Sequence, residues 1–401
     1  MNFKKIYRVG KDFSLSIIAS AIVTGVLQIA VYPYLAKKYG ADEYGIILTV
    51  MGVVNIFITA LGNTLNNTRL IQEDIYRKKE LHGDYNALLW IACVTAGVVV
   101  LGISGSMTNL SLINRVFLMA ATVGGVLRSY YCVQYRIVLD FTKNMISNCV
   151  VAAGYIVGIL VYNFYENWPV IFVMGEVIGL IYIIKTCEIV HEKMQFTILF
   201  KETSLKYVML IVTGLLGNIL VYLDRLLLLP SLGGEAVSIY TVASFFGKTL
   251  GIVMTPIAGV LLGYYAQKNF AMNRKLFWII NSSVLIVSAA FFLVTVLLGE
   301  WFTGILYPEL IEQSAPYMIL ANLASIINAT ASMTQPSVLK YAPTYWQIII
   351  QCVYCIGYIG LGVIMMQKWG IMGFCVAALI ANLLRLLLLY VLGNNYIKSS
   401  Y

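Results

Sequence analysis

Residues 14–36 read SLSIIASAIVTGVLQIAVYPYLA and contain no charged side chain. A helix of about 20 apolar residues spans the hydrocarbon core of a bilayer, so this stretch predicts a transmembrane helix. It is too long for the apolar core of a signal peptide, and it lacks a small-residue cleavage site. We therefore expect it to be the first membrane span rather than a secretory signal.

Apolar runs of this kind recur along the whole chain of 401 residues, of which 60% are hydrophobic and only 11% charged. Soluble domains carry about 25% charged residues, so the composition excludes a soluble globular protein, and the high hydrophobicity excludes disorder. The predicted fold class is an all-α polytopic membrane protein. Polar breaks separate about twelve predicted transmembrane helices, near 14–36, 44–66, 85–105, 115–138, 145–165, 169–188, 207–229, 237–265, 276–298, 314–335, 345–367 and 371–393.

Two short matches indicate that the chain contains an internal repeat. Residues 24–27 (TGVL) resemble 213–216 (TGLL), and residues 40–42 (GAD) resemble 233–235 (GGE). Chance similarity between apolar helices is the alternative. The repeat predicts an N-terminal six-helix lobe (1–190), a cytoplasmic linker (191–206) and a C-terminal six-helix lobe (207–401). With six spans each, the lobes would be related by a pseudo-two-fold axis along the membrane normal.

The basic residues predict the orientation of the chain. With the N-terminus inside, the inner segments hold 17 Lys and Arg residues and the outer segments hold four, namely Lys37, Lys38, Arg115 and Lys368. Such a bias is typical of cytoplasmic loops. We therefore expect both termini on the cytoplasmic side, and most of the net charge of +9 serves topology.

A few charged side chains lie deep inside predicted spans, where an ionised group costs at least ~2.5–3.5 kcal/mol. Four are basic and two acidic: Arg128, Arg225, Lys248, Arg385, Glu176 and Asp224. The surplus of positive charge favours an anionic passenger, such as a phosphate or pyrophosphate head group. Asp224 and Glu176 are candidates for coupling H⁺ or Na⁺ to transport. The alternative for Asp224 and Arg225 is mutual neutralisation that lets the helix insert.

Polar side chains recur at helical spacing in four spans and predict a hydrated lining. In the eighth span, positions 241, 244, 248, 251 and 255 form one stripe of polar or small residues. Small residues alone would indicate close helix packing, but the lysine at 248 shifts the balance toward a watery cavity. The predicted polar lining consists of Gln28, Asn55, Thr59, Asn218, Thr241, Ser244 and Thr255.

Other function classes lack their motifs. No phosphate-binding Gly-x-x-x-x-Gly-Lys-Ser/Thr loop occurs, and no acidic cluster on a substantial loop suggests a glycosyltransferase. The seven cysteines lie within or at the edge of apolar runs and both histidines in polar loops, which argues against a metal site. We therefore expect a transporter rather than an enzyme, with no cofactor other than an H⁺ or Na⁺ coupling ion and no nucleic-acid partner.

Several stretches resemble a known family. They are 39–45 (YGADEYG), 223–225 (LDR), 232–243 (LGGEAVSIYTVA), 298–301 (LGEW), 306–309 (LYPE) and 315–317 (APY). In order and spacing they are similar to O-antigen and capsular polysaccharide flippases of the multidrug/oligosaccharidyl-lipid/polysaccharide exporter superfamily. The resemblance covers essentially the whole chain.

The resemblance implies two six-helix lobes around a cavity that the first, second, seventh and eighth spans line. It also implies a passenger: an undecaprenyl-pyrophosphate-linked oligosaccharide, moved from the inner to the outer leaflet of the bacterial cytoplasmic (inner) membrane by alternating access. This step would serve surface polysaccharide assembly, including lipopolysaccharide or capsule, beside the polysaccharide polymerase machinery. Arg128, Arg225, Lys248 and Arg385 become candidate cargo ligands. The alternatives are a cation-coupled drug antiporter, a membrane glycan polymerase and a purely structural subunit.

Overall fold

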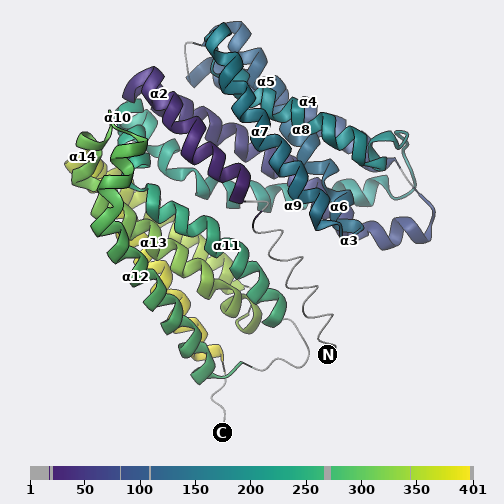
Figure 1. Ribbon diagram of the computed structural model, residues 1–401. Helices are drawn as coiled ribbons and strands as arrows, with labels where there is room; N and C mark the ends of the chain where they lie inside the picture. The colour runs from purple at the N-terminus through teal and green to yellow at the C-terminus, as the bar shows by residue number, and fades with distance from the viewer. Residues whose placement is uncertain are drawn as a thin grey trace. The chain divides into compact units, whose positions relative to one another are not determined.

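The computed structural model describes residue 18 and residues 21–81, 83–107, 110–265, 272–343 and 345–397. Within these residues every regular element is a helix, as expected from the sequence (Figure 1). Six of the 17 inner basic residues that predict the orientation lie outside the described residues: the four in 1–13 (Lys4, Lys5, Arg8 and Lys11), Lys268 and Lys398.

The elements follow one another in short succession. They are η1 (Leu27–Val31), α2 (Tyr32–Phe57), η2 (Ile58–Asn63), α3 (Thr64–Lys78), α4 (Asp84–Met107), α5 (Leu112–Tyr131), α6 (Val133–Ile137), α7 (Phe141–Tyr165), α8 (Pro169–Thr186), η3 (Glu188–His191), α9 (Phe200–Val221), α10 (Leu223–Ala243), α11 (Phe245–Tyr265), α12 (Arg274–Leu306), α13 (Ile311–Tyr341) and α14 (Tyr345–Tyr396).

Ten helical stretches in the described part of the chain are long and apolar enough to cross a membrane. Tyr345–Tyr396 contains two of the predicted spans, and Ala21–Lys78 contains the predicted span 44–66 and residues 21–36 of the first predicted span. Residues 14–17, 19 and 20 of that first span lie outside the described residues. The predicted span 314–335 lies in α13, which is not among the ten because polar residues such as Asn322 and Thr330 interrupt its apolar sequence. The expectation of an all-α, multi-spanning membrane protein is confirmed.

Sharp breaks divide the long helical stretches where the sequence predicts loops. Gly40 inside α2 has φ 71° and ψ 178°, and Gly233 inside α10 has φ 85° and ψ 179°. These two glycines occupy matching positions of the predicted repeat and share one backbone conformation, which supports the sequence match. Trp369 and Gly370 make a further break that divides α14 into two helices.

The helix that follows Gly233 is capped by a residue from the first break. Asp42 Oδ1 accepts hydrogen bonds from the backbone N–H groups of Gly234 (3.0 Å) and Glu235 (3.3 Å). Ser238 Oγ donates to the carbonyl oxygen of Ala41. A carboxylate at a helix N-terminus satisfies N–H groups that have no partner inside the helix. The two breaks therefore stabilise each other.

The chain divides into two compact units, unit 1 (Met1–Leu35 and Ile46–Arg225) and unit 2 (Ala36–Gly45 and Leu226–Tyr401). Helix α9 belongs to unit 1, where Tyr207 donates from its hydroxyl to the carbonyl oxygen of Leu61 (3.0 Å). Residues 36–45 belong to unit 2. The expected lobe bounds of 1–190 and 207–401 stay a prediction.

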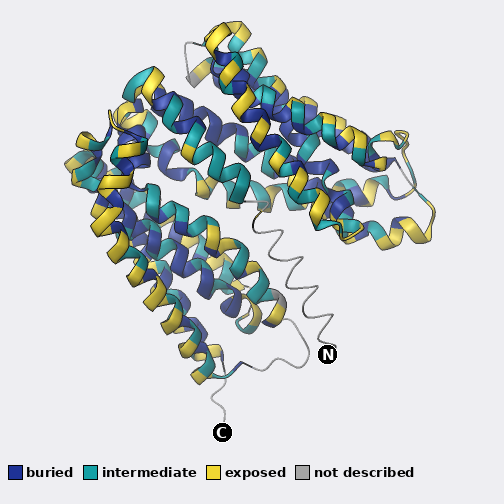
Figure 2. Ribbon diagram, in the orientation of Figure 1, coloured by how far each residue is buried: buried dark blue, intermediate teal, exposed yellow. Residues whose placement is uncertain are grey.

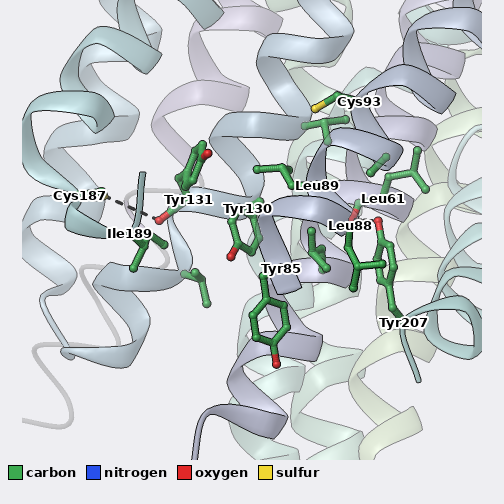
Figure 3. Close-up of a cluster of buried hydrophobic side chains, with 14 of the residues drawn as sticks. Leu61, Tyr85, Leu88, Leu89, Cys93, Tyr130, Tyr131, Cys187, Ile189 and Tyr207 are labelled. Atoms are coloured by element: carbon green, nitrogen blue, oxygen red, sulfur yellow. Dashed lines mark hydrogen bonds between the residues drawn. The ribbon is translucent and has the colours of Figure 1, made fainter. Parts of the chain in front are cut away.

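Unit 1 has a dense core of aromatic and aliphatic side chains. Tyr85, Leu89 and Tyr130 are fully buried there beside Tyr131 and Tyr207 (Figure 3). Lipid tails are as apolar as leucine, so between membrane helices close packing and hydrogen bonds stabilise the fold more than burial of apolar area does. Tyrosine suits such a core because its ring packs while its hydroxyl finds an acceptor.

The outward surface of unit 2 is apolar along α12. Ile286 is 69% exposed and Leu297 is 70% exposed, and exposed positions follow this helix over its length (Figure 2). Single exposed apolar residues are common on soluble proteins, but a continuous apolar helix surface indicates an apolar solvent. This surface fits the acyl chains of a bilayer.

Side-chain hydrogen bonds hold the segment between α8 and α9 against the rest of unit 1. Glu192 accepts from both terminal nitrogens of Arg69, at 2.9 and 2.6 Å, and its carbonyl oxygen accepts from Asn86 Nδ2 (2.6 Å). Further along, Asp84 Oδ1 accepts from the backbone N–H of Thr197 (2.7 Å). The segment therefore follows the surface of unit 1 over this stretch.

Candidate functional site

Half-buried Arg128 and buried Glu176 form an ion pair in unit 1. Arg128 Nε donates to Glu176 Oε2 (2.6 Å) and Nη2 donates to Oε1 (3.0 Å), which joins α5 to α8. Tyr155, from α7, donates a hydrogen bond from its hydroxyl to Oε1 of the same carboxylate (3.1 Å). The planar guanidinium matches a carboxylate in this two-point geometry. The charge of Arg128 is therefore compensated inside unit 1.

Asp224 and Arg225 lie at the start of α10, and both are buried in unit 1. Asp224 Oδ1 accepts from the backbone N–H of Arg225 (2.8 Å), and the guanidinium of Arg225 donates to the carbonyl oxygen of Leu48 (2.9 Å). The same guanidinium lies 5.5 Å from the centroid of the Tyr222 ring. Arg225 thus joins α10 to α2, and its contacts serve packing as well as charge.

The predicted stripe of the eighth span begins in α10 and continues along α11 in unit 2. Thr241 and Ser244 are buried, Lys248 is half-buried and Thr255 is exposed. Lys248 Nζ lies 5.2 Å from the centroid of the Tyr240 ring, within the range of a cation–π contact. The side chains of the stripe are therefore buried at its start and become more exposed along α11.

The remaining predicted lining residues belong to unit 1, and two lie in unusual helix. Gln28 is in η1 and Thr59 in η2, both π-helical turns. Such turns place an extra residue in the helix and occur often at functional sites. Asn55 and Asn218 are half-buried, and Asn218 Nδ2 donates to the carbonyl oxygen of Gly214 (2.8 Å).

Arg385 lies on α14 in unit 2 among neutral side chains. Its Nη1 donates to Asn328 Oδ1 and its Nη2 donates to Gln335 Oε1, both at 2.6 Å. The guanidinium carbon lies 5.1 Å from the centroid of the Tyr354 ring. Arg385 is thus held by amides and an aromatic ring.

The predicted site residues divide between the two units. Unit 1 holds Gln28, Asn55, Thr59, Arg128, Glu176, Asn218, Asp224 and Arg225, and unit 2 holds Thr241, Ser244, Lys248, Thr255 and Arg385. Both deep acids therefore lie in unit 1, whereas unit 2 holds two deep cations. A single cavity that all of these residues line stays a prediction.

Sequence reasoning missed the partners of the deep charges. Asn328, Ser332 and Gln335 recur at intervals of four and three along α13 and are half-buried, a stripe like those in the other spans. That spacing was the available signal for the surroundings of Arg385. Tyr155 had no such signal, because one tyrosine in an apolar helix does not show which way it faces.

No family model and no curated protein matches the sequence. Solved structures do match. The lipid II flippase MurJ, in its inward closed conformation, has a TM-score of 0.67 and 15% identity over 97% of this chain and 87% of that chain. The Vibrio cholerae MATE transporter VcmN in the bent form has a TM-score of 0.67 and 13% identity over 99% and 98%.

A multidrug resistance MATE family transporter of the MOP superfamily, in an outward-facing conformation, has a TM-score of 0.60 and 13% identity, over 96% of this chain and 94% of that chain. At such low identity these matches establish the fold and leave the cargo open. This chain has the fold shared by MurJ and MATE transporters, over nearly its whole length.

Proposed function

We propose that the chain is a flippase. It moves an undecaprenyl-pyrophosphate-linked oligosaccharide from the inner to the outer leaflet of the bacterial inner membrane, by alternating access, for assembly of a surface polysaccharide such as O-antigen or capsule. The observation that carries the proposal is the pair of deep cations in unit 2, Lys248 and Arg385, beside polar stripes. The likeness to a lipid II flippase supports a lipid-linked cargo.

The proposed mechanism assigns a role to each class of residue. The cations bind the pyrophosphate, because guanidinium and ammonium groups bind phosphate oxygens through charge-assisted hydrogen bonds. The polar stripes face the sugars, and the polyprenyl tail stays in the lipid. Asp224 and Glu176 are the groups that would exchange H⁺ or Na⁺ as the protein changes conformation.

The direct test removes one cation at a time in the native host. Lys248→Ala and Arg385→Ala should each abolish surface polysaccharide while the amount of protein in the membrane stays normal, because each removes a cargo ligand. Lys368→Ala is the matched control, since Lys368 is exposed and lies in a predicted outer loop. If Lys248→Ala and Arg385→Ala both give wild-type amounts of polysaccharide, the role of these residues as cargo ligands is refuted.

A cation-coupled antiporter for drugs is the second candidate, which the likeness to multidrug MATE transporters favours. Expression in a drug-sensitised strain separates the two functions. An antiporter raises the inhibitory concentration of cationic drugs and does so through Glu176 or Asp224. A dedicated flippase leaves drug sensitivity unchanged and restores polysaccharide in a flippase-deficient strain.

A further inference from the structure

Arg385 is a cation that makes no ion pair with any residue that the structure describes. It is half-buried, and in the described part of the chain no carboxylate lies within ion-pair distance of its guanidinium. Asn328 and Gln335, the two residues that bind it, are neutral and lie two turns apart on one face of α13. A charge removed from bulk water is costly unless an opposite charge compensates it.

This cluster has several N–H donors that its internal hydrogen bonds do not use. A guanidinium has five N–H donors and no acceptor, so each amide must present its oxygen to Arg385 and turn its NH₂ group away. Among the residues that the structure describes, neither NH₂ group has a hydrogen-bond partner. Two of the five guanidinium donors are used in the two bonds to the amides.

Unit 1 contains a comparable arginine whose charge is compensated by a carboxylate. There, three successive predicted spans supply Arg128 (α5), Tyr155 (α7) and Glu176 (α8), and the carboxylate accepts from the other two side chains. In unit 2, the helices in corresponding order supply amides from α13, then Tyr354 and Arg385 from the two halves of α14. The tyrosine recurs on the middle helix, the arginine lies on the third helix instead of the first, and among the described residues no carboxylate joins it.

We propose that Arg385, Asn328 and Gln335 form a binding subsite for a phosphate-type oxyanion. Guanidinium and amide N–H groups are suitable donors for a tetrahedral anion, because each of its oxygens accepts more than one hydrogen bond. As far as the cargo is concerned, the subsite rests on the proposed flippase function, in which the anion is the pyrophosphate of the lipid-linked unit. A phospholipid phosphate offers the same chemistry.

Isothermal titration calorimetry of the purified full chain in detergent with inorganic pyrophosphate tests the subsite. Wild-type protein should bind pyrophosphate. Gln335→Glu introduces a carboxylate of nearly the same shape, which should pair with Arg385 as Glu176 pairs with Arg128. We expect Gln335→Glu and Arg385→Gln each to weaken binding by about 10- to 100-fold.

Gln134→Glu is the matched control, because it adds the same charge in unit 1. Gln134 Oε1 accepts from the backbone N–H of Ile189 (3.2 Å), a role that a carboxylate oxygen keeps. Asn328→Asp replaces Gln335→Glu if the latter does not elute as a single folded species. Absence of binding to wild type, or unchanged binding to Arg385→Gln and to the folded carboxylate variant, overturns the proposal.

Nanodiscs separate the two sources of the anion. In phosphatidylcholine discs, undecaprenyl pyrophosphate should compete with pyrophosphate at the subsite; competition by phosphatidylglycerol instead identifies a phospholipid phosphate as its ligand. Failure of the flippase proposal looks different. In that case Arg385-dependent pyrophosphate binding persists while Arg385→Ala cells still make surface polysaccharide. Loss of polysaccharide without loss of binding refutes the subsite alone.

Discussion

Arg128 and Arg385 show how one neighbouring side chain decides what a half-buried arginine can do. Glu176 accepts two hydrogen bonds from Arg128 and neutralises its charge. The resulting ion pair joins α5 to α8. Arg385 makes the same number of hydrogen bonds, but both acceptors are amides. Its charge therefore remains available to an external anion, whereas that of Arg128 does not.

The Arg128–Glu176 pair makes a prediction about stability. Removing one partner of a buried ion pair leaves an uncompensated charge and costs about 3–5 kcal/mol. Glu176→Leu should therefore lower the melting temperature of the protein in detergent, as followed by tryptophan fluorescence. The double variant Arg128→Met with Glu176→Leu should regain most of that stability, because an apolar pair of similar size replaces the charges.

The double variant also separates stability from ion coupling. If Glu176 exchanges H⁺ or Na⁺, the double variant stays folded and loses transport. Glu176→Leu melting at the wild-type temperature would contradict the structural role of the pair.

Residue charge was readable from the sequence, but residue environment was not. A lysine or arginine inside an apolar run stands out because of its insertion cost, so Arg385 and Lys248 could be selected from the sequence. Their surroundings depend on which face of one helix meets another. Asn328 and Gln335 become partners of Arg385 only because α13 packs against α14 with that face inward.

At the scale of elements, the two glycine breaks carry the most information. Gly40 and Gly233 have positive φ combined with ψ near 180°, a region that is accessible essentially only to glycine. No other atoms crowd the position of a Cβ at Gly40, so the backbone angle rather than space requires glycine there. Each break divides a helical stretch at a place where the sequence predicts a connection between consecutive spans.

We expect Gly40→Ala and Gly233→Ala to destabilise the protein by about 1–3 kcal/mol each, because alanine is strained at these angles. Thermal melting of the two variants in detergent measures the effect. Gly217→Ala is the control, since Gly217 lies inside α9 with ordinary angles and open space around its Cβ. It should be neutral or stabilising by up to about 1 kcal/mol. Equal melting temperatures for all three variants would show that backbone strain is not the cause.

The repeat of these breaks was predictable because glycine followed by a small and then an acidic residue recurs in both halves, at 40–42 and at 233–235. The π-helical turns η1 and η2 were not. A π turn adds one residue to a helical turn without a characteristic composition, so neither Leu27–Val31 nor Ile58–Asn63 differs from ordinary apolar helix in its sequence. Two of the predicted lining residues, Gln28 and Thr59, lie in these turns.

At the scale of the whole molecule, the hydropathy pattern predicts the spans and the basic residues predict their direction. The expected orientation follows from 17 inner against four outer basic residues. It places Lys201 inside and Lys368 outside the cell. Both residues are exposed and can carry a reporter without disturbing a packed helix.

Cysteine labelling tests this orientation. In a background in which the exposed Cys149 and Cys352 are replaced by alanine, Lys368→Cys should react with a membrane-impermeant maleimide in spheroplasts. Lys201→Cys should react only after the membrane is permeabilised. The reverse pattern would place both termini outside and would reverse the proposed direction of transport.

The capping of the second break by Asp42 has a consequence for biosynthesis. Asp42 and Gly234 are 192 residues apart in the chain. At about 5–20 residues per second, the ribosome needs roughly 10–40 s to make the distance between them. During that time the segment 36–45 has left the ribosome, but its hydrogen-bond partners do not yet exist. Unit 2 cannot complete its fold until residues 226–401 have been made and inserted. The insertion machinery or the bilayer surface must therefore keep segment 36–45 from aggregating or pairing wrongly until then.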